Sequence, residues 1–133
     1  MSDSQTVYVV DDDESVRQSL ARLLRAAGYQ AESFASAAEF MACVRCDGPS
    51  CAVIDVRMPD VSGFELFQQL QERCPGLPVV FITGHGDVAM ADRAVKAGAT
   101  EFLVKPVDEA VLLRAVDRAL AGASRERLTS GGG

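Results

Sequence analysis

The chain has 133 residues, 48% of them hydrophobic, which is enough for one globular domain with a single sizeable core. Thirteen basic and nineteen acidic side chains give a formal net charge of −6, which disfavours non-specific attraction to nucleic acid or to an anionic membrane. No apolar run approaches the roughly 20 residues of a membrane span, and residues 1–6 lack the apolar core of a signal peptide. We therefore expect a cytoplasmic protein with no membrane partner.

Short apolar runs, rich in β-branched residues, alternate with longer segments of helical period. The predicted strands are, in chain order, TVYVV (6–10), QAESF (30–34), CAVI (51–54), PVVFI (78–82) and EFLV (101–104). After each of them, apolar side chains recur every three or four residues, as on one face of a helix. These five stripes begin at Val16, Ala37, Phe64, Val88 and Leu112. The pattern predicts five strands alternating with five helices.

Turn and capping residues agree with this division. Gly28 and Gly98 stand where helices should end, and Ser36 and Asp87 can cap the helices that follow them. Strict alternation of continuous apolar strands with helices implies a parallel sheet that is covered by helices on both faces. The predicted fold class is α/β, with a single five-stranded sheet.

Four cysteines lie at positions 43, 46, 51 and 74. Cys43 and Cys46 form a C-x-x-C pair, but Cys51 follows too closely, and no second pair or nearby histidine completes a zinc site. Disulfides are rare in cytosolic proteins. We therefore expect reduced and mostly packed thiols rather than a metal centre.

Polar side chains stand where the predicted strands end, and in sheets of this kind ligands bind outside these carboxyl ends, at the switch in strand order. If the order is the flavodoxin-like 2-1-3-4-5, strands one, three and four are central and the fifth flanks them. Acids from two central strands would then converge, with a hydroxyl and an ammonium group beside them. The residues concerned are Asp11, Asp12, Asp13, Asp55, Thr83 and Lys105.

Residues 11–13 place three carboxylates side by side, and two unit charges held about 4 Å apart near a protein surface repel by up to ~4 kcal/mol. A bound cation would share that charge. Oxygen-only ligands select a hard divalent cation, and a site with few protein ligands suits Mg²⁺ better than Ca²⁺. Mg²⁺ held by carboxylates commonly binds phosphate, and Lys105 is a compact charge suited to a phosphoryl oxygen. The predicted chemistry is phosphoryl transfer.

Four segments together resemble the receiver domains of two-component response regulators. They are VVDDD at the first strand, IDVRMPDVSG around Asp55, ITGHGD after the fourth strand, and GATEFLVKP, which ends in Lys105-Pro106. The similarity spans residues 6 to about 121. The second and third segments look most like receivers of the FixJ type, which precede a helix-turn-helix DNA-binding domain. The resemblance implies the flavodoxin-like (βα)5 fold with strand order 2-1-3-4-5.

The resemblance also implies roles for individual residues. Asp55 would be the nucleophile that accepts a phosphoryl group from a phosphohistidine of a sensor histidine kinase. Asp12 would bind Mg²⁺ directly, Asp11 through water, and Asp55 and the backbone carbonyl of Arg57 would supply further oxygens. Lys105 would pair with the carboxylate before transfer and with the phosphoryl group afterwards. Such a domain catalyses only its own phosphorylation and dephosphorylation and is not otherwise an enzyme.

A switch is implied by Thr83 and Phe102. A phosphoryl oxygen on Asp55 would draw the Thr83 hydroxyl inward, and the Phe102 ring would turn from exposed to buried in the space that this leaves. The face built from the fourth helix, the fifth strand and the fifth helix would then form a homodimer. Lys105-Pro106 resembles a cis peptide of the family, although the sequence allows either isomer.

A phosphatase of the haloacid dehalogenase type is the rival interpretation. Asp11-x-Asp13-x-Ser15 after an apolar strand looks like that family's signature, with Asp11 as nucleophile and Asp13 as general acid. Thr83 and Lys105 fit both families. Against it, Lys105 is not followed by the acidic pair that these phosphatases carry at a later strand end, and the chain leaves no room for a domain covering the substrate.

Each candidate residue also has a purely structural interpretation. The acids at 11–14 suit the cap and first turn of a helix, Asp55 suits a turn, and Thr83 suits a local hydrogen bond at a strand end. Phe102 suits a core position and Lys105 a solvated surface. Only their joint occurrence at successive strand ends favours the functional interpretation.

The end of the chain, AGASRERLTSGGG, is polar and rich in glycine. We expect a receiver domain over residues 1–122 and a flexible linker or tail over residues 123–133. The DNA-binding effector domain would lie outside this chain, so that DNA is bound only through it. His85 is expected to be an ordinary loop residue, since a lone histidine without acidic or cysteine partners is a poor metal ligand.

Overall fold

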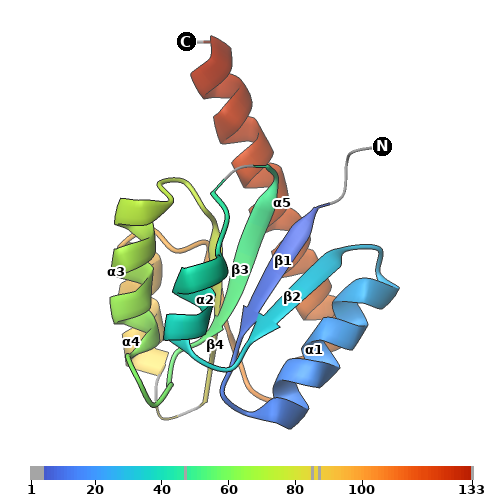
Figure 1. The fold of residues 1–133 in the computed structure, drawn as a ribbon, viewed down its shortest axis with the longest axis vertical. Coiled ribbons are helices and arrows are strands. Elements are labelled where there is room, and N and C mark those ends of the chain that lie inside the picture. Colours follow the sequence, from blue (N-terminus) through green and yellow to red (C-terminus); the bar gives the residue numbers. More distant parts are fainter. Residues whose placement is uncertain (1–4, 47, 85, 87, 133) are drawn as a thin grey trace.

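The computed structural model describes the backbone of residues 5–46, 48–84, 86 and 88–132, with side chains up to residue 122 (Figure 1). The expectations for His85 and for Asp87 as a cap lie outside the described residues. The strands are β1 (Thr6–Val10), β2 (Gln30–Phe34), β3 (Ser50–Asp55), β4 (Val79–Thr83) and β5 (Glu101–Val104). The helices are α1 (Glu14–Ala26), α2 (Ala37–Cys43), α3 (Gly63–Arg73), α4 (Val88–Lys96) and α5 (Glu109–Gly132).

All strands are parallel and are ordered β2-β1-β3-β4-β5, which confirms the predicted fold class and strand order. The register places Val10 beside Phe34 on one side and Ile54 on the other, so β1 and β3 end at the same edge. In β3 and β4, Asp55 pairs with Ile82. The acids after β1 and at the end of β3 therefore meet at the carboxyl-end edge of the sheet.

Two cores cover the two faces of the sheet because successive strand residues point to opposite sides. Tyr8 of β1 packs with α2, α3 and α4, whereas its neighbours Val7 and Val9 pack with α1 and α5. Figure 1 shows α1 and α2 on opposite sides of β2. Burial on both faces explains why the strands read as continuous apolar runs.

Caps fix where the helices begin and end. Asp13 accepts a hydrogen bond from Val16 N at the start of α1, and Ser36 caps α2 as predicted. Gly28 and Gly98, predicted at helix ends, have φ of 100° and 126°, a region that glycine adopts without strain. The Lys105-Pro106 peptide is cis.

Two strands, β3 and β4, differ from their predicted bounds by one residue at each end. β3 extends by one residue at both ends, and β4 begins after Pro78, which has no N–H to donate to a neighbouring strand, and continues to Thr83. As a result, Asp55 is the last residue of β3 and Thr83 is the last residue of β4, so both belong to the sheet. The position of these two side chains is therefore set by the sheet rather than by a loop.

The expectation of reduced thiols is wrong for two of the four cysteines. Cys46 and Cys74 form a disulfide with a Cα–Cα distance of 5.2 Å, within the range that a disulfide spans without backbone movement. Cys51 is a buried free thiol, as expected, and burial raises its pKa to about 12. Cys43 is free and exposed. The pair was missed because 28 positions separate its members, and only the fold brings them together.

The last helix continues past the predicted domain boundary at residue 122. The α5 backbone is helical to Gly132 and projects beyond the sheet (Figure 1). The assignment of residues 123–133 as a flexible linker or tail stays a prediction. None of the helices in the described part of the chain is long and apolar enough to cross a membrane.

Candidate functional site

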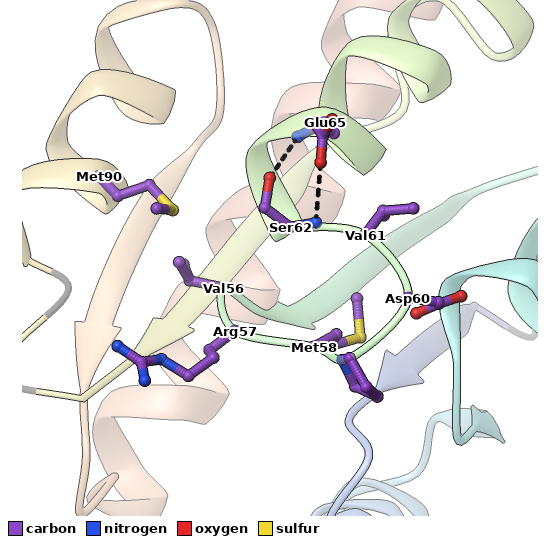
Figure 2. Close-up of a pocket in the computed structure, with 9 residues that line it drawn as sticks. Val56, Arg57, Met58, Asp60, Val61, Ser62, Glu65 and Met90 are labelled. Carbon is purple, nitrogen blue, oxygen red and sulfur yellow. Dashed lines mark hydrogen bonds between the residues drawn. The ribbon is translucent and has the colours of Figure 1, made fainter.

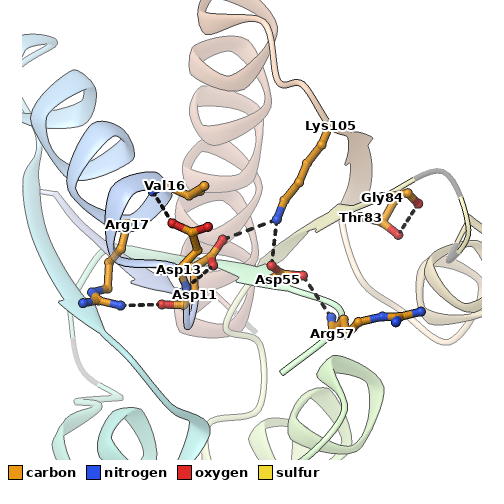
Figure 3. A network of polar contacts seen from close by, with 9 residues as sticks. All are labelled: Asp11, Asp13, Val16, Arg17, Asp55, Arg57, Thr83, Gly84 and Lys105. Carbon is orange, nitrogen blue, oxygen red and sulfur yellow. Dashed lines mark hydrogen bonds and ion pairs between the residues drawn. The ribbon is translucent and has the colours of Figure 1, made fainter. Parts of the chain in front are cut away.

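Four chain segments bring polar or charged side chains to the carboxyl-end edge of the sheet, as Figure 3 shows. Asp11 follows β1, Asp55 is the last residue of β3, Thr83 is the last residue of β4, and Lys105 follows β5. Asp11, Asp55 and Thr83 are almost fully buried, with 1%, 6% and 0% of their surface exposed. We call Asp11, Asp12, Asp55 and Lys105 the acidic site.

The Asp11 main chain is held on both sides. Its N–H donates to Phe34 O at 3.1 Å, and its carbonyl accepts from Arg17 Nη1 at 2.8 Å. The Oδ1 atom accepts from Asp13 N at 2.9 Å. In contrast, the buried Oδ2 atom has no hydrogen-bond partner among the described residues, and its nearest cation, Lys105 Nζ, lies 3.8 Å away. One carboxylate oxygen is thus fixed and incompletely satisfied.

The Asp55 carboxylate is held by two donors of different kinds. Its Oδ1 atom accepts from the backbone N–H of Arg57 at 2.9 Å, and its Oδ2 atom accepts from Lys105 Nζ at 2.9 Å. The donor from Arg57 exists because the chain turns directly after β3. Lys105 reaches across from the end of β5, as predicted from the strand ends (Figure 3).

Burial and charge change the ionisation of the acidic site. Burial, together with the nearby charge of Asp55, raises the pKa of Asp11 to about 6, although the hydrogen bond from Asp13 acts in the opposite direction. Burial lowers the pKa of Lys105, but the hydrogen bond and charge of Asp55 and the charge of Asp11 outweigh it, so this pKa is raised. Lys105 therefore stays an ammonium ion. Its single positive charge lies beside two buried acidic side chains, Asp11 and Asp55.

Oxygen atoms of Asp11, Asp12 and Asp55 all lie within 4.8 Å of one another. Asp12 is exposed, so one side of the cluster faces solvent. An all-oxygen donor set with one orphaned buried carboxylate oxygen fits a hard divalent cation that keeps some of its water. The acidic site is thus a pocket that could bind a metal ion.

The loop that follows Asp55 lines a pocket of about 460 Å³, which Figure 2 shows in close-up. Met90 of α4 faces the loop from across this pocket. Ser62 Oγ accepts from Glu65 N at 3.1 Å, and Glu65 Oε1 accepts from Ser62 N at 3.1 Å. This capping box fixes the start of α3 and therefore the end of the loop.

The two predicted switch residues lie on neighbouring strands. Thr83 is fully buried, and its hydroxyl donates to Gly84 O at 3.1 Å, which is the local hydrogen bond of the structural interpretation. Phe102 is half-buried rather than exposed and packs on the core formed by α2, α3 and α4. Thr83 pairs with Val104 in the sheet and is one residue past Ile82, the partner of Asp55.

Two residues at this edge were not among the predicted site residues. Arg17 holds the Asp11 carbonyl from α1, and Asp60 accepts from Ala37 N and Ala38 N at 3.4 and 3.1 Å, joining the loop after β3 to the start of α2. Burial acts to raise the pKa of Asp60, but these backbone donors outweigh it and lower the pKa. Neither contact leaves a periodic signal, because each joins segments that only packing brings together.

The geometry gives little support to the phosphatase interpretation. It requires Asp13 to be free as a general acid, whereas Asp13 Oδ1 accepts the N-cap hydrogen bond from Val16 N at 3.1 Å. It also requires Asp11 to be the nucleophile, whereas Lys105 Nζ lies 0.9 Å closer to Asp55 than to Asp11, at 2.9 against 3.8 Å. The better-held acid is Asp55.

Comparison with known proteins agrees with this arrangement. The sequence profile of the response regulator receiver domain matches residues 7–117. The response regulator protein TodT of Pseudomonas putida is 42% identical over 96% of this chain and 56% of its own length. The transcriptional regulatory protein FixJ of Azorhizobium caulinodans is 47% identical over 96% of this chain and 60% of its own length. The chain thus spans little more than half the length of these curated relatives.

Solved structures give the same result. The response regulator StyR has a TM-score of 0.89 at 46% identity and covers 97% of this chain with 65% of its own. The structure described as FixJ-N has a TM-score of 0.82 at 43% identity, with 91% of this chain and 96% of that chain covered. From its fold, its sequence profile and these relatives, the chain belongs to the receiver domain family of two-component response regulators, a family of signalling domains.

Proposed function

We propose that this chain is a phosphorylation-activated switch in which Asp55 accepts a phosphoryl group from a phosphohistidine of a sensor histidine kinase. One observation carries the proposal: the Asp55 carboxylate is buried, is held between Lys105 Nζ and Arg57 N, and has a second buried acid beside it. In the transfer, an Asp55 oxygen forms a bond to phosphorus while the bond from phosphorus to the histidine nitrogen breaks.

Mg²⁺ is the cofactor that the donor set supports. Asp11, Asp12, Asp55 and the backbone carbonyl of Arg57 would hold it. When bound, the ion neutralises charge on the phosphoryl oxygens. Asp11 and Asp12 would supply ligands, and the positive charge of the ion would offset the repulsion between their carboxylates. Arg17 keeps the Asp11 main chain in position. Lys105 would move from pairing with the carboxylate to pairing with the transferred group.

The output would be a change of packing at the face formed by α4, β5 and α5. A phosphoryl oxygen on Asp55 gives the Thr83 hydroxyl a stronger acceptor than Gly84 O, which it contacts in this structure. Phe102 is already half-buried, so its full burial is a small rearrangement. Phosphorylation would therefore promote a homodimer through this face. Sedimentation before and after saturating phosphorylation tests this, and an unchanged sedimentation coefficient would contradict it.

The longer protein is proposed to be a cytoplasmic transcription regulator. Relatives include a protein named as a transcriptional regulator, and they extend well beyond the matched region. A DNA-binding effector domain following α5 would read the dimeric state. On this proposal the chain is not an enzyme for an external substrate, and it contacts DNA only through that domain.

Incubation with acetyl phosphate and Mg²⁺ tests the acceptor function, with intact-protein mass as the measurement. Wild type should gain one phosphoryl group, and Asp55→Asn should gain none, because an amide is not a nucleophile here. Asp60→Asn is the matched control, since Asp60 lies in the same loop and the single amide oxygen of asparagine can still accept from one of the two backbone N–H groups that the carboxylate binds. Phosphorylation of Asp55→Asn at the wild-type level would refute the proposal.

A further inference from the structure

The corner where α2 ends, β3 begins and α3 ends contains chemistry that phosphoryl transfer does not use. The disulfide between Cys46 and Cys74 joins the segment before β3 to the end of α3. It lies at the amino-end edge of the sheet, opposite the acidic site. Cys43, at the last position of α2, is an exposed free thiol in the same corner.

Both cysteines are held in place by contacts other than the disulfide. Cys74 N donates to Leu70 O at 2.7 Å, and Cys74 O accepts from Leu77 N at 3.1 Å. Beside Cys46, Arg45 N donates to Tyr8 Oη at 3.2 Å, and Tyr8 Oη donates to Arg45 O at 3.4 Å. Tyr8 is buried in β1, so it anchors this segment to the sheet.

A hydrogen bond also joins α2 to α3 next to the disulfide. Arg73 Nη1 donates to Met41 O, so the end of α3 stays attached to the end of α2. These hydrogen bonds and the two cores do not involve the disulfide, so we expect the fold to persist when the disulfide is reduced. The sulfur atoms would remain close enough to pair again.

The two sulfur atoms differ in access. Cys46 is exposed, whereas Cys74 is 3% exposed and belongs to the core of α2, α3 and α4. Cys46 Sγ also lies 3.4 Å from Arg73 O, so a reduced Cys46 thiol has an acceptor in place. An attacking thiolate therefore reaches the Cys46 sulfur, and the Cys74 sulfur is the leaving group.

We propose that Cys46 and Cys74 form a redox-modification site that exchanges two electrons with small thiols and disulfides of the glutathione class. In reduction, a thiolate bonds to Cys46 Sγ, the bond to Cys74 Sγ breaks, and the Cys74 thiolate takes a proton from solvent. A second thiolate then attacks the sulfur of the bound small molecule, which leaves as the small disulfide and frees the Cys46 thiolate. Oxidation by the small disulfide is the reverse. We call the pair the Cys46–Cys74 clasp.

The clasp lies at the end of the helix that follows the loop after Asp55. Gly63 N, at the start of α3, donates to Val56 O at 2.7 Å, and a Cβ atom at Gly63 would lie 2.8 Å from Val56 Cα. The other end of α3 carries Cys74. The redox state of the clasp therefore determines whether this helix is covalently held at the end opposite the loop. The inference does not rest on the proposed phosphorylation.

The test is equilibration of the full chain in buffers of defined ratio of reduced to oxidised glutathione. Free thiols are then alkylated, and disulfide peptides are identified by mass spectrometry. Wild type should form the Cys46–Cys74 peptide pair reversibly, with loss of two alkylation sites on oxidation. Cys43→Ser is the matched control and should behave as wild type, because its thiol lies in the same corner but outside the clasp.

Cys46→Ser supplies the second variant. It should leave Cys74 as a protected thiol that alkylates slowly in the folded protein, and its circular dichroism should match that of reduced wild type. Three outcomes would overturn the proposal. They are pairing of Cys46 with Cys43 in wild type, absence of the Cys46–Cys74 pair at every glutathione ratio, and a clasp that excess reduced glutathione cannot open while the chain is folded.

Discussion

The two edges of the sheet contrast in how their polar groups are satisfied. At the amino-end edge, the Tyr8 hydroxyl forms a hydrogen bond with the Arg45 carbonyl, and the Arg73 side chain donates one to Met41 O. A disulfide joins Cys46 to Cys74 at the same edge. At the carboxyl-end edge, two buried carboxylates share one ammonium group, and Asp11 Oδ2 lacks a hydrogen bond among the described residues. The first edge stabilises the fold, whereas the second keeps an unbalanced charge that a ligand can satisfy.

The same contrast follows from general energetics. An unpaired buried charge lowers stability and persists only where something else compensates for it. The acids at the carboxyl-end edge are held in place by the backbone N–H groups of Asp13 and Arg57, which orient them without neutralising them. Pre-organised and under-neutralised carboxylates are what a cation site requires before its ion arrives.

Reduction of the clasp should cause the largest loss of stability. A cross-link over 28 positions restricts the unfolded chain and contributes about 3–4 kcal/mol to the free energy of unfolding. Urea denaturation with and without reductant measures the difference, with Cys46→Ser as the variant that should not respond to reductant. Mg²⁺ binding should be equal in both redox states. A change in Mg²⁺ affinity on reduction would show that the two edges are not independent.

Asp11→Asn should stabilise the metal-free protein at pH 7.5 by about 2–3 kcal/mol, because it removes a buried charge whose pKa is raised to about 6. A raised pKa means that the carboxyl group stabilises the fold below its unfolded value of 3.8 and loses this contribution as the pH rises through 6. The gain from Asn should therefore vanish near pH 4. Thermal unfolding between pH 4 and 8 in a chelator measures it.

The magnesium response of the same variant gives the control. Mg²⁺ should raise the melting temperature of wild type and should have much less effect on Asp11→Asn, which has lost a ligand. Asp117→Asn is a suitable comparison, since Asp117 lies on α5 with its Oδ1 bonded to Tyr29 Oη and away from the acidic site. A variant at position 11 that is less stable than wild type at pH 7.5 would contradict the account of the carboxyl-end edge.

Gly63→Ala should destabilise the chain by about 2 kcal/mol, because the new Cβ would lie 2.8 Å from Val56 Cα and 3.0 Å from Asp55 O, and neither backbone atom can move freely. Gly122→Ala is the matched control. Apart from the adjacent turns of its own helix, no atom of the described residues lies within 4 Å of a Cβ at this position, so the exchange should stabilise by about 0.5–1 kcal/mol. Equal effects at both positions in urea denaturation would show that the close approach of α3 to the loop is wrong.

Ser62→Ala should have the smallest effect, a loss of about 1 kcal/mol, because it removes the Oγ acceptor of the capping box at the start of α3. Ser15→Ala on α1 is the comparison, since Ser15 is exposed and alanine favours a helix. Urea denaturation of both variants measures the difference. A neutral result at Ser62 would mean that the loop after β3 is held by other contacts.

Much of the acidic site could be predicted because it depends on strand ends. Once the strands were placed and their order taken from the family, Asp11, Asp55 and Lys105 had to meet at one edge of a parallel sheet, and they do. The structural interpretations also apply to two of the candidate residues. Asp13 caps α1, and Phe102 is half-buried on the core, so neither position by itself distinguishes a functional from a structural role.

The opposite edge could not be predicted in the same way. Cys46 lies in a connecting segment and Cys74 at a helix end, so no sequence periodicity relates the two positions. The general rule that cytosolic proteins rarely contain disulfides also led to a wrong prediction. The contact of Arg17 with the Asp11 carbonyl could not be predicted either, since it depends on the orientation of α1. Long-range contacts made by single side chains leave no pattern in the sequence.

Location of the phosphorylated residue distinguishes Asp55 from Asp11 as the phosphoryl acceptor. After incubation with acetyl phosphate and Mg²⁺, the acyl phosphate is reduced with borohydride and the modified peptide is sequenced by mass spectrometry. We expect a single modified residue, Asp55. Modification of Asp11 in its place would contradict the account and favour the phosphatase interpretation.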